Sequence, residues 1–355
     1  MRRRVTVVIA VLLAAAGCSP DSSQQAATTT TPSTTAAPTT VARACSFDAV
    51  GSEGEVTWLD GSTLMAATPT GSERCLVDGI AGTPATVQWS GDGTKVLLND
   101  SLRTAAGVQE RYPRSEGLVL SRPTGKSVIE IAGGRLLKHV SGASTPTDIT
   151  FVAQPTEAIY HPAGRSIVAS GRNNDDPVLV VADNLGRDPQ VVARGEEATA
   201  VRSLAFTASN ALLFVGDHPD GSHLHRLELD TLKLTTVATA KAPGRIDHVT
   251  TSPFPGGGVA WTQGGACDLV VSQDAKFVHV SGSPAASATP VGWLPDRSLV
   301  VKTGCGGPSD KGDLYVVAAG QGPRLLAKGA TAAAVRAVLP APAAPPPAIP
   351  DQAPA

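Results

Sequence analysis

Short apolar runs alternate with polar or glycine-bearing turns from residue 55 to residue 339. The clearest examples are pairs of apolar runs joined by one turn, a pattern that is typical of β-hairpins. Each pair ends in a small residue before the next loop. Hairpins are therefore expected at residues 63–79, 117–133, 178–195, 224–240, 268–282 and 314–329.

A second kind of segment precedes five of these hairpins, and it carries an aromatic residue in a fixed slot. Trp89, Tyr160, Phe206 and Trp293 occupy this slot, whereas Thr251 replaces the aromatic residue in the fifth unit. A turn and a short apolar strand follow the slot. These segments lie at residues 87–100, 158–171, 204–217, 249–261 and 291–304. Each unit is expected to be a four-stranded meander of about 40 to 46 residues, which is the period of propeller blades.

Six such units predict an all-β fold, a six-bladed β-propeller of four-stranded antiparallel blades over residues 44–339. One such sheet cannot bury both faces alone, but sheets packed face to face around an axis can. The first unit supplies only three strands, so we expect residues 332–339 to complete it and close the ring. The alternative closing strand is residues 44–50. Residues 135–153 exceed the period and are expected to form a long loop or extra hairpin between the second and third units.

The turns after the aromatic slot resemble those of the TolB-type β-propeller repeat, in which an aromatic residue precedes Ser-Pro-Asp-Gly and an apolar strand. The match is best at Trp89-Ser90-Gly91-Asp92-Gly93, and partial at Trp293-Leu294-Pro295-Asp296 and His161-Pro162-Ala163-Gly164. The resemblance covers most of residues 55–339 and implies the fold rather than a function. TolB carries a separate N-terminal domain that we do not expect in this chain, so its partner contacts are not carried over.

The first residues have the layout of a bacterial lipoprotein signal. Arg2, Arg3 and Arg4 precede a short apolar stretch, and Ala-Ala-Gly-Cys ending at Cys18 is similar to a lipobox. We therefore expect removal of residues 1–17 and lipidation of Cys18, in a lipoprotein of actinobacterial type. Ordinary secretory cleavage is the alternative. The chain is expected at the outer face of the cell membrane, held there by the lipid on Cys18.

Two segments flank the predicted propeller and are too poor in large apolar residues to fold. Residues 18–43 consist mostly of Ser, Thr, Pro and Ala, and are expected to be a disordered tether between the lipid and the folded body. Residues 340–355 are rich in Pro and Ala, and are expected to be a disordered tail. The formal net charge is −2 and no basic patch stands out, so we expect no nucleic-acid partner.

Four cysteines fall within the predicted propeller, and an even number in an exported chain predicts disulfides. Cys267 and Cys305 precede the third strands of two neighbouring units, where equivalent loops lie side by side, so we expect them to pair. Cys45 and Cys75 would then tie the start of the body to the outer strand of the first unit. The alternative is four free buried thiols.

One stretch, residues 217–225, gathers residue types that bind metals. His223 and His225 alternate, so they share one face of a strand, and Asp217 and His218 lie nearby. Imidazoles with a carboxylate can bind zinc. No further ligand at a fixed spacing is visible, so we interpret the stretch as a polar loop entering a strand, and His223, His225 and Asp217 remain candidates only.

No linear motif for catalysis is encoded, since neither Gly-x-Ser-x-Gly nor His-Glu-x-x-His occurs. We therefore predict no catalytic residue and no cofactor, and a binding or scaffolding module for an envelope protein, a small molecule or a glycan. The alternative is an enzyme, such as a hydrolase, lactonase or glycosidase, with its site in the central channel. Convergent carboxylates, Asn or His in the channel mouth would favour the enzyme, and an apolar channel would favour binding.

Overall fold

The computed structural model describes residues 45–47, 54–80, 86–112, 115–194, 198–265, 267–273, 276–279, 285–305 and 310–336. All of them belong to the unit Arg43–Ala355. The predicted signal, tether and tail, and with them Cys18, lie outside these ranges. Within the ranges we find no apolar helix of the length that crosses a membrane.

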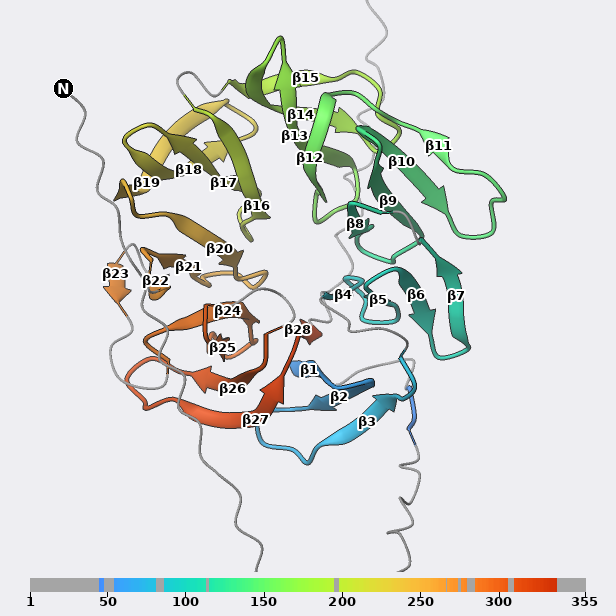
Figure 1. Ribbon diagram of the computed structural model, residues 1–355, viewed down its shortest axis with the longest axis vertical. Helices are drawn as coiled ribbons and strands as arrows, with labels where there is room; N and C mark the ends of the chain where they lie inside the picture. Colours follow the sequence, from blue (N-terminus) through green and yellow to red (C-terminus); the bar gives the residue numbers. More distant parts are fainter. Residues whose placement is uncertain are drawn as a thin grey trace, which may run out of the picture. The chain divides into compact units, whose positions relative to one another are not determined.

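The described residues form seven antiparallel sheets of four strands each, arranged as blades around a common centre (Figure 1). In every blade the first strand named is the innermost and the last is the outermost. Blade 1 contains β28 (Ala333–Arg336), β1 (Glu55–Asp60), β2 (Thr63–Ala67) and β3 (Arg74–Val77). Blade 2 contains β4 (Val87–Trp89), β5 (Val96–Leu98), β6 (Ser101–Thr104) and β7 (Gly107–Arg111). Blade 3 contains β8 (Gly117–Leu120), β9 (Ser127–Ala132), β10 (Arg135–Val140) and β11 (Thr147–Asp148).

The remaining four blades follow in chain order. Blade 4 contains β12 (Ala153–Tyr160), β13 (Ser166–Asn173), β14 (Asp176–Asp183) and β15 (Gln190–Arg194). Blade 5 contains β16 (Ala200–Phe206), β17 (Ala211–His218), β18 (Gly221–Glu228) and β19 (Lys233–Lys241). Blade 6 contains β20 (Ile246–Thr251), β21 (Val259–Gln263), β22 (Asp268–Gln273) and β23 (Lys276–His279). Blade 7 contains β24 (Ala288–Trp293), β25 (Leu299–Thr303), β26 (Gly312–Val317) and β27 (Arg324–Ala330).

The predicted propeller of four-stranded blades is confirmed, but the predicted number of six blades is wrong. The second predicted unit is divided between two blades. Residues 87–100 form the inner hairpin of blade 2, which continues outwards as β6 and β7. Residues 117–133 instead begin blade 3. Residues 135–153 are therefore not an insertion between blades, because they contain β10 and β11, the outer strands of blade 3.

The ring closes through the strand that the sequence predicted. β28 pairs antiparallel with β1, with Glu55 opposite Arg336 and Trp58 opposite Ala333. Residues 45–47, in the alternative closing segment, lie outside any strand. Blade 1 thus joins strands from both ends of the folded body.

Neighbouring blades pack face to face, and the aromatic slot fills the junctions. The slot residue is the last residue of the inner strand in its blade. Trp89 ends β4 and packs with Leu64 of blade 1. Tyr160, Phe206 and Trp293 end β12, β16 and β24, and each packs against the blade that precedes its own. The aromatic residues of the slot therefore pack between neighbouring blades.

Candidate functional site: the central channel

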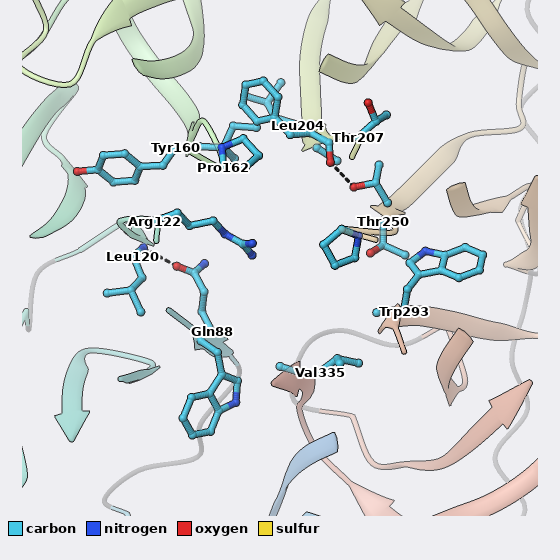
Figure 2. A pocket seen from close by; sticks show the side chains of 18 of the residues that line it. Gln88, Leu120, Arg122, Tyr160, Pro162, Leu204, Thr207, Thr250, Trp293 and Val335 are labelled. Carbon is cyan, nitrogen blue, oxygen red and sulfur yellow. Dashed lines mark hydrogen bonds between the residues drawn. The ribbon is translucent and has the colours of Figure 1, made fainter. Parts of the chain in front are cut away.

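A channel of about 440 Å³ opens at the centre of the ring, where the inner strands end (Figure 2). All seven blades contribute to its wall, each through the last residues of its inner strand or the turn that follows. Most of the lining side chains are apolar, mainly valine, leucine and aromatic residues, but polar atoms supply about half of the exposed wall. Among the described residues that line it there is no carboxylate, histidine, lysine or cysteine.

Arg122 is the one charged side chain among these described lining residues. It lies in the turn after β8, two positions beyond the end of the inner strand. The equivalent positions in the other blades whose turns are described hold small residues or prolines, namely Gly91, Pro162, Ala208, Pro253 and Pro295. Blade 3 therefore departs from the repeat at the position that reaches the channel.

The Arg122 guanidinium points into the channel and makes no hydrogen bond or ion pair with any described residue (Figure 2). Burial by the channel walls lowers the pKa of Arg122, and no anion among the described residues opposes that shift. Because an arginine remains charged in proteins, the described part of the channel holds an uncompensated positive charge.

Gln88, on the neighbouring inner strand β4, points toward Arg122 (Figure 2). Its Oε1 atom accepts a hydrogen bond from the backbone N–H of Leu120, which fixes the side-chain amide. The NH₂ group of that amide is then turned to the channel as a donor. A guanidinium beside an amide donor is suited to bind a carboxylate or another anionic group.

Arg122 is not apparent from the sequence, because the apolar runs at residues 117–133 predict the outer hairpin of a unit. The signal that could have identified Arg122 is that it stands two positions after the end of an inner strand, where the other units have Gly, Ala or Pro. That signal becomes visible only once β8 is recognised as an inner strand.

The three metal candidates named from the sequence do not all come together. His223 and His225 share one face of β18, as predicted, and His218 at the end of β17 joins them. Asp217 lies on the opposite face, where its carboxylate accepts hydrogen bonds from Arg202 at 2.7 and 2.8 Å and from the Ser222 hydroxyl at 2.7 Å. The structure therefore replaces Asp217 with His218 in this group, which we call the histidine cluster.

The histidine cluster borders a cavity of about 480 Å³ between blades 4 and 5. Its three ligand nitrogens lie within 4.8 Å of one another. Burial, followed by the nearby charges of His218 and His223, lowers the pKa of His225 to about 4. This imidazole is consequently neutral at neutral pH.

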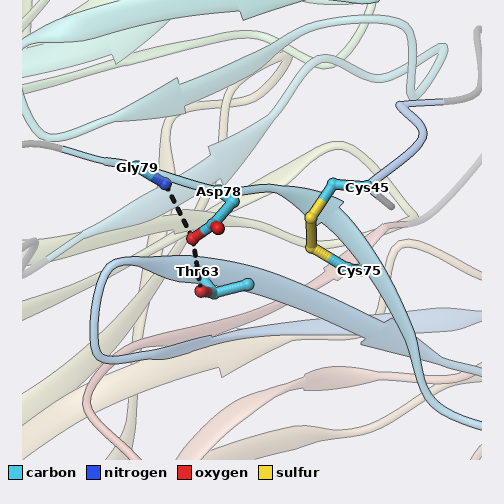
Figure 3. The surroundings of a disulfide bond; sticks show 5 residues. All are labelled: Cys45, Thr63, Cys75, Asp78 and Gly79. Carbon is cyan, nitrogen blue, oxygen red and sulfur yellow. Dashed lines mark hydrogen bonds between the residues drawn. A yellow bond between two sulfur atoms is a disulfide. The ribbon is translucent and has the colours of Figure 1, made fainter. Parts of the chain in front are cut away.

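Two disulfides join the four cysteines in the pairs that the sequence predicted. Cys45 bonds to Cys75 at the outer strand of blade 1, with the Cα atoms 4.6 Å apart (Figure 3). Cys267 of blade 6 bonds to Cys305 of blade 7, with the Cα atoms 5.5 Å apart. The second bridge links equivalent loops of adjacent blades.

A hydrogen-bonded corner follows the first disulfide (Figure 3). The Asp78 carboxylate accepts hydrogen bonds from the Thr63 hydroxyl and from the backbone N–H of Gly79, both at 2.8 Å. The Thr63 hydrogen bond, followed by that of Gly79, holds the pKa of Asp78 below its ordinary value. The corner is an ordinary Asp turn and carries no binding chemistry of its own.

Fold and channel together define the class of this protein as a seven-bladed β-propeller with an open central channel. Solved structures similar to it include one described as a prolyl endopeptidase, with a TM-score of 0.54 and 12% identity over 80% of this chain and 49% of that one. Another is the S511A mutant of puromycin hydrolase complexed with PGG, with a TM-score of 0.52 and 16% identity over 81% and 54%. TolB from Acinetobacter baumannii is also similar, with a TM-score of 0.49 and 13% identity over 80% and 67%.

These likenesses concern the fold alone, and the chain spans about half of the peptidase and hydrolase chains. No family model and no curated protein sequence matches the chain.

Proposed function

We propose that the protein is an exported lipoprotein of the cell envelope, and that its propeller binds a ligand through a carboxylate held in the central channel. The observation that carries the binding part is the Arg122 guanidinium, which no described residue pairs. The channel, the positive charge and the Gln88 amide donor converge at one place, and most of the surrounding side chains are apolar. A pocket of this kind, with few polar groups in an apolar lining, is the usual form of a ligand site.

Export is supported by the two disulfides, which persist in oxidising compartments. It is supported further by the signal-like residues 1–17 and by Cys18 at the lipobox position. A lipid on Cys18 would keep the propeller at the membrane surface, with residues 18–43 as the tether.

Binding is favoured over hydrolysis by the composition of the channel wall. Acid–base catalysis relies on a histidine, carboxylate, lysine, cysteine or tyrosine, and a serine or threonine nucleophile needs such a base beside it. Of these acid–base groups the described lining holds Tyr160 alone, whose hydroxyl is hydrogen-bonded to Ser127 and whose pKa burial raises to about 12. The likeness to parts of a peptidase and of a hydrolase does not add such a group.

The binding proposal can be tested with paired peptides. The full chain is titrated with a panel of short peptides that carry a free C-terminal carboxylate and with the same peptides amidated, and the fluorescence of Trp89 and Trp293 at the channel wall is followed. Carboxylate peptides should bind, and Arg122→Gln should weaken them by about tenfold or more, because a hydrogen bond to a charged group is worth about 1.5–3 kcal/mol.

The matched control is Arg165→Gln, which removes an exposed arginine from the β12–β13 turn. It should leave the affinity unchanged. Equal binding of carboxylate and amide, or equal affinity in Arg122→Gln and wild type, would refute the channel site. The anchor is tested separately, since Cys18→Ala should release the protein from the membrane fraction and continued anchoring would contradict the lipoprotein assignment.

A further inference from the structure

The histidine cluster has buried nitrogen atoms that the described protein leaves without hydrogen-bond partners. Nε2 of His218 and Nε2 of His223 are both buried, and neither forms a hydrogen bond with a described residue. The two rings stack with their centroids 4.4 Å apart. Burying an imidazole nitrogen without a hydrogen bond is costly, and each such atom in a native protein needs an explanation.

The third ring is oriented by a neighbouring strand. Nδ1 of His225 lies 3.3 Å from the Thr236 hydroxyl on β19. When Nδ1 donates its proton to that hydroxyl, Nε2 carries the lone pair and faces the other two rings. Metal-binding histidines are commonly held in this way through the nitrogen that does not bind the metal.

Gly216 keeps the space between the rings open. A Cβ atom at this position would lie 2.9 Å from Nε2 of His218 and 3.3 Å from Nε2 of His225. Gly216 stands opposite His223 in the register of β17 and β18. Its φ angle is outside the left-handed region, so the backbone does not require glycine at this position. Because Gly216 has no side chain, the volume beside the three nitrogens stays empty.

From these observations we propose that His218, His223 and His225 bind one divalent transition-metal ion of the zinc type. Neutral imidazole nitrogen is a preferred ligand of Zn²⁺ and Cu²⁺, and three histidines with an open fourth position are a known zinc arrangement. The ion would satisfy both buried Nε2 atoms at once.

Small side-chain rotations complete the geometry. A tetrahedral ion with Zn–N distances of about 2.0–2.1 Å holds its ligand nitrogens about 3.3 Å apart. The nitrogens of the cluster lie within 4.8 Å, so each ring needs to move by a fraction of the difference. The fourth position opens to the cavity between blades 4 and 5, and a carboxylate lies close by on Asp220, whose Oδ1 is 3.4 Å from Nε2 of His223.

The site is independent of the channel, because its residues lie on β17 and β18 rather than on inner strands. The test uses the full chain, purified without a polyhistidine tag and stripped with a chelator. Isothermal titration calorimetry with ZnCl₂ should give one site per chain with a dissociation constant in the micromolar range or below. MgCl₂ should give no binding, since Mg²⁺ prefers oxygen ligands.

Gly216→Ala is the sharpest variant, because it fills the ion's space while all seven histidines remain. It and His223→Gln should each weaken zinc binding by about tenfold or more. His161→Asn is the matched control; it removes a histidine whose Nδ1 accepts a hydrogen bond from the Ala163 backbone, and it should bind zinc as wild type does.

Co²⁺ gives a second measurement that needs no variant. The visible spectrum of the Co²⁺ protein should be that of a tetrahedral nitrogen site and should disappear on addition of Zn²⁺. Zinc binding that survives both Gly216→Ala and His223→Gln would overturn the proposal, as would a dissociation constant above the millimolar range or an octahedral cobalt spectrum.

Discussion

Two junctions between blades bury polar side chains, and they differ in whether these side chains have hydrogen-bond partners. At the junction of blades 1 and 2, Arg336 is fully buried, and its Nη1 pairs with Glu55 at 3.0 Å. Its Nε donates to the Gly93 carbonyl at 2.8 Å, and the guanidinium lies 4.3 Å from the centroid of the Trp89 ring. Trp89 in turn donates to the Thr57 hydroxyl at 2.8 Å.

At the junction of blades 4 and 5, by contrast, Nε2 of His218 and Nε2 of His223 form no hydrogen bond with any described residue. Both junctions lie between four-stranded antiparallel sheets with apolar packing. The first junction satisfies its buried polar groups within the protein, whereas the two histidine nitrogens at the second have no hydrogen-bond partner among the described residues.

The largest effect should come from removing the closing strand. Deletion of residues 331–355 takes away β28 and leaves the edge of β1 unpaired, so the cooperative unfolding transition should be lost in a thermal scan followed by circular dichroism. A chain that ends at Leu339 keeps β28 and is the control. A normal melting curve for the shorter chain would show that β28 is dispensable.

Arg336→Met should destabilise the ring by about 3 kcal/mol, because it leaves the buried Glu55 carboxylate with Arg74 as its remaining ion-pair partner among the described residues. Urea unfolding gives the free energy. The double variant Glu55→Gln with Arg336→Met removes the buried charge and should recover part of the loss. A single variant as stable as wild type would mean that the pair contributes nothing to closure.

Thr57→Val should cost about 1–2 kcal/mol, since it removes the acceptor of the buried Trp89 indole N–H. Thr57→Ser retains the hydroxyl and should lose far less. The same urea titration compares the two variants. If valine and serine behaved alike, the indole hydrogen bond would have no weight in the junction.

The smallest effect is expected at the histidine cluster. In metal-free protein, His218→Leu should leave the free energy of unfolding within about 0.5 kcal/mol of wild type or raise it, because the lost Nε2 made no hydrogen bond with a described residue. In the presence of Zn²⁺ the wild type should gain stability and the variant should not. A large loss of unfolding free energy in the metal-free variant would show that His218 stabilises the fold, and the two junctions would then not differ in this respect.

The fold was predictable wherever alternation and the aromatic slot agree, as in most of blades 4 to 7. Closure by β28 was also predictable, because the first unit lacks one strand and an apolar segment follows the last hairpin, although residues 44–50 were an alternative. The number of blades was not. β7 (Gly107–Arg111) is an exposed outer strand that needs backbone pairing only, so its side chains carry no pattern. β8 ends in Leu120 instead of an aromatic residue, so nothing in its sequence marks it as an inner strand.

The candidate sites depend on pairing between distant segments, which limits what the sequence can predict. Alternation alone places His223 and His225 on one face, and this was correct. Whether Asp217 or His218 joins them depends on the register of β17 and β18. The two-residue turn between these strands sets Gly216 opposite His223, which places His218 on the same face. Arg122 can be assigned to the channel only when all seven inner strands have been identified, because together they form its wall.

Blade 1 draws β1, β2 and β3 from one end of the folded body and β28 from the other. During synthesis, the four strands of each of blades 2 to 7 emerge one after another, but the inner edge of β1 stays unpaired until residues 333–336 have emerged. A chain that lacks β28 leaves the inner edge of β1 unpaired, so the ring is not closed. Among the described strands, β28 is therefore the last to be made, and the ring closes only after the strands of the other six blades have been synthesised.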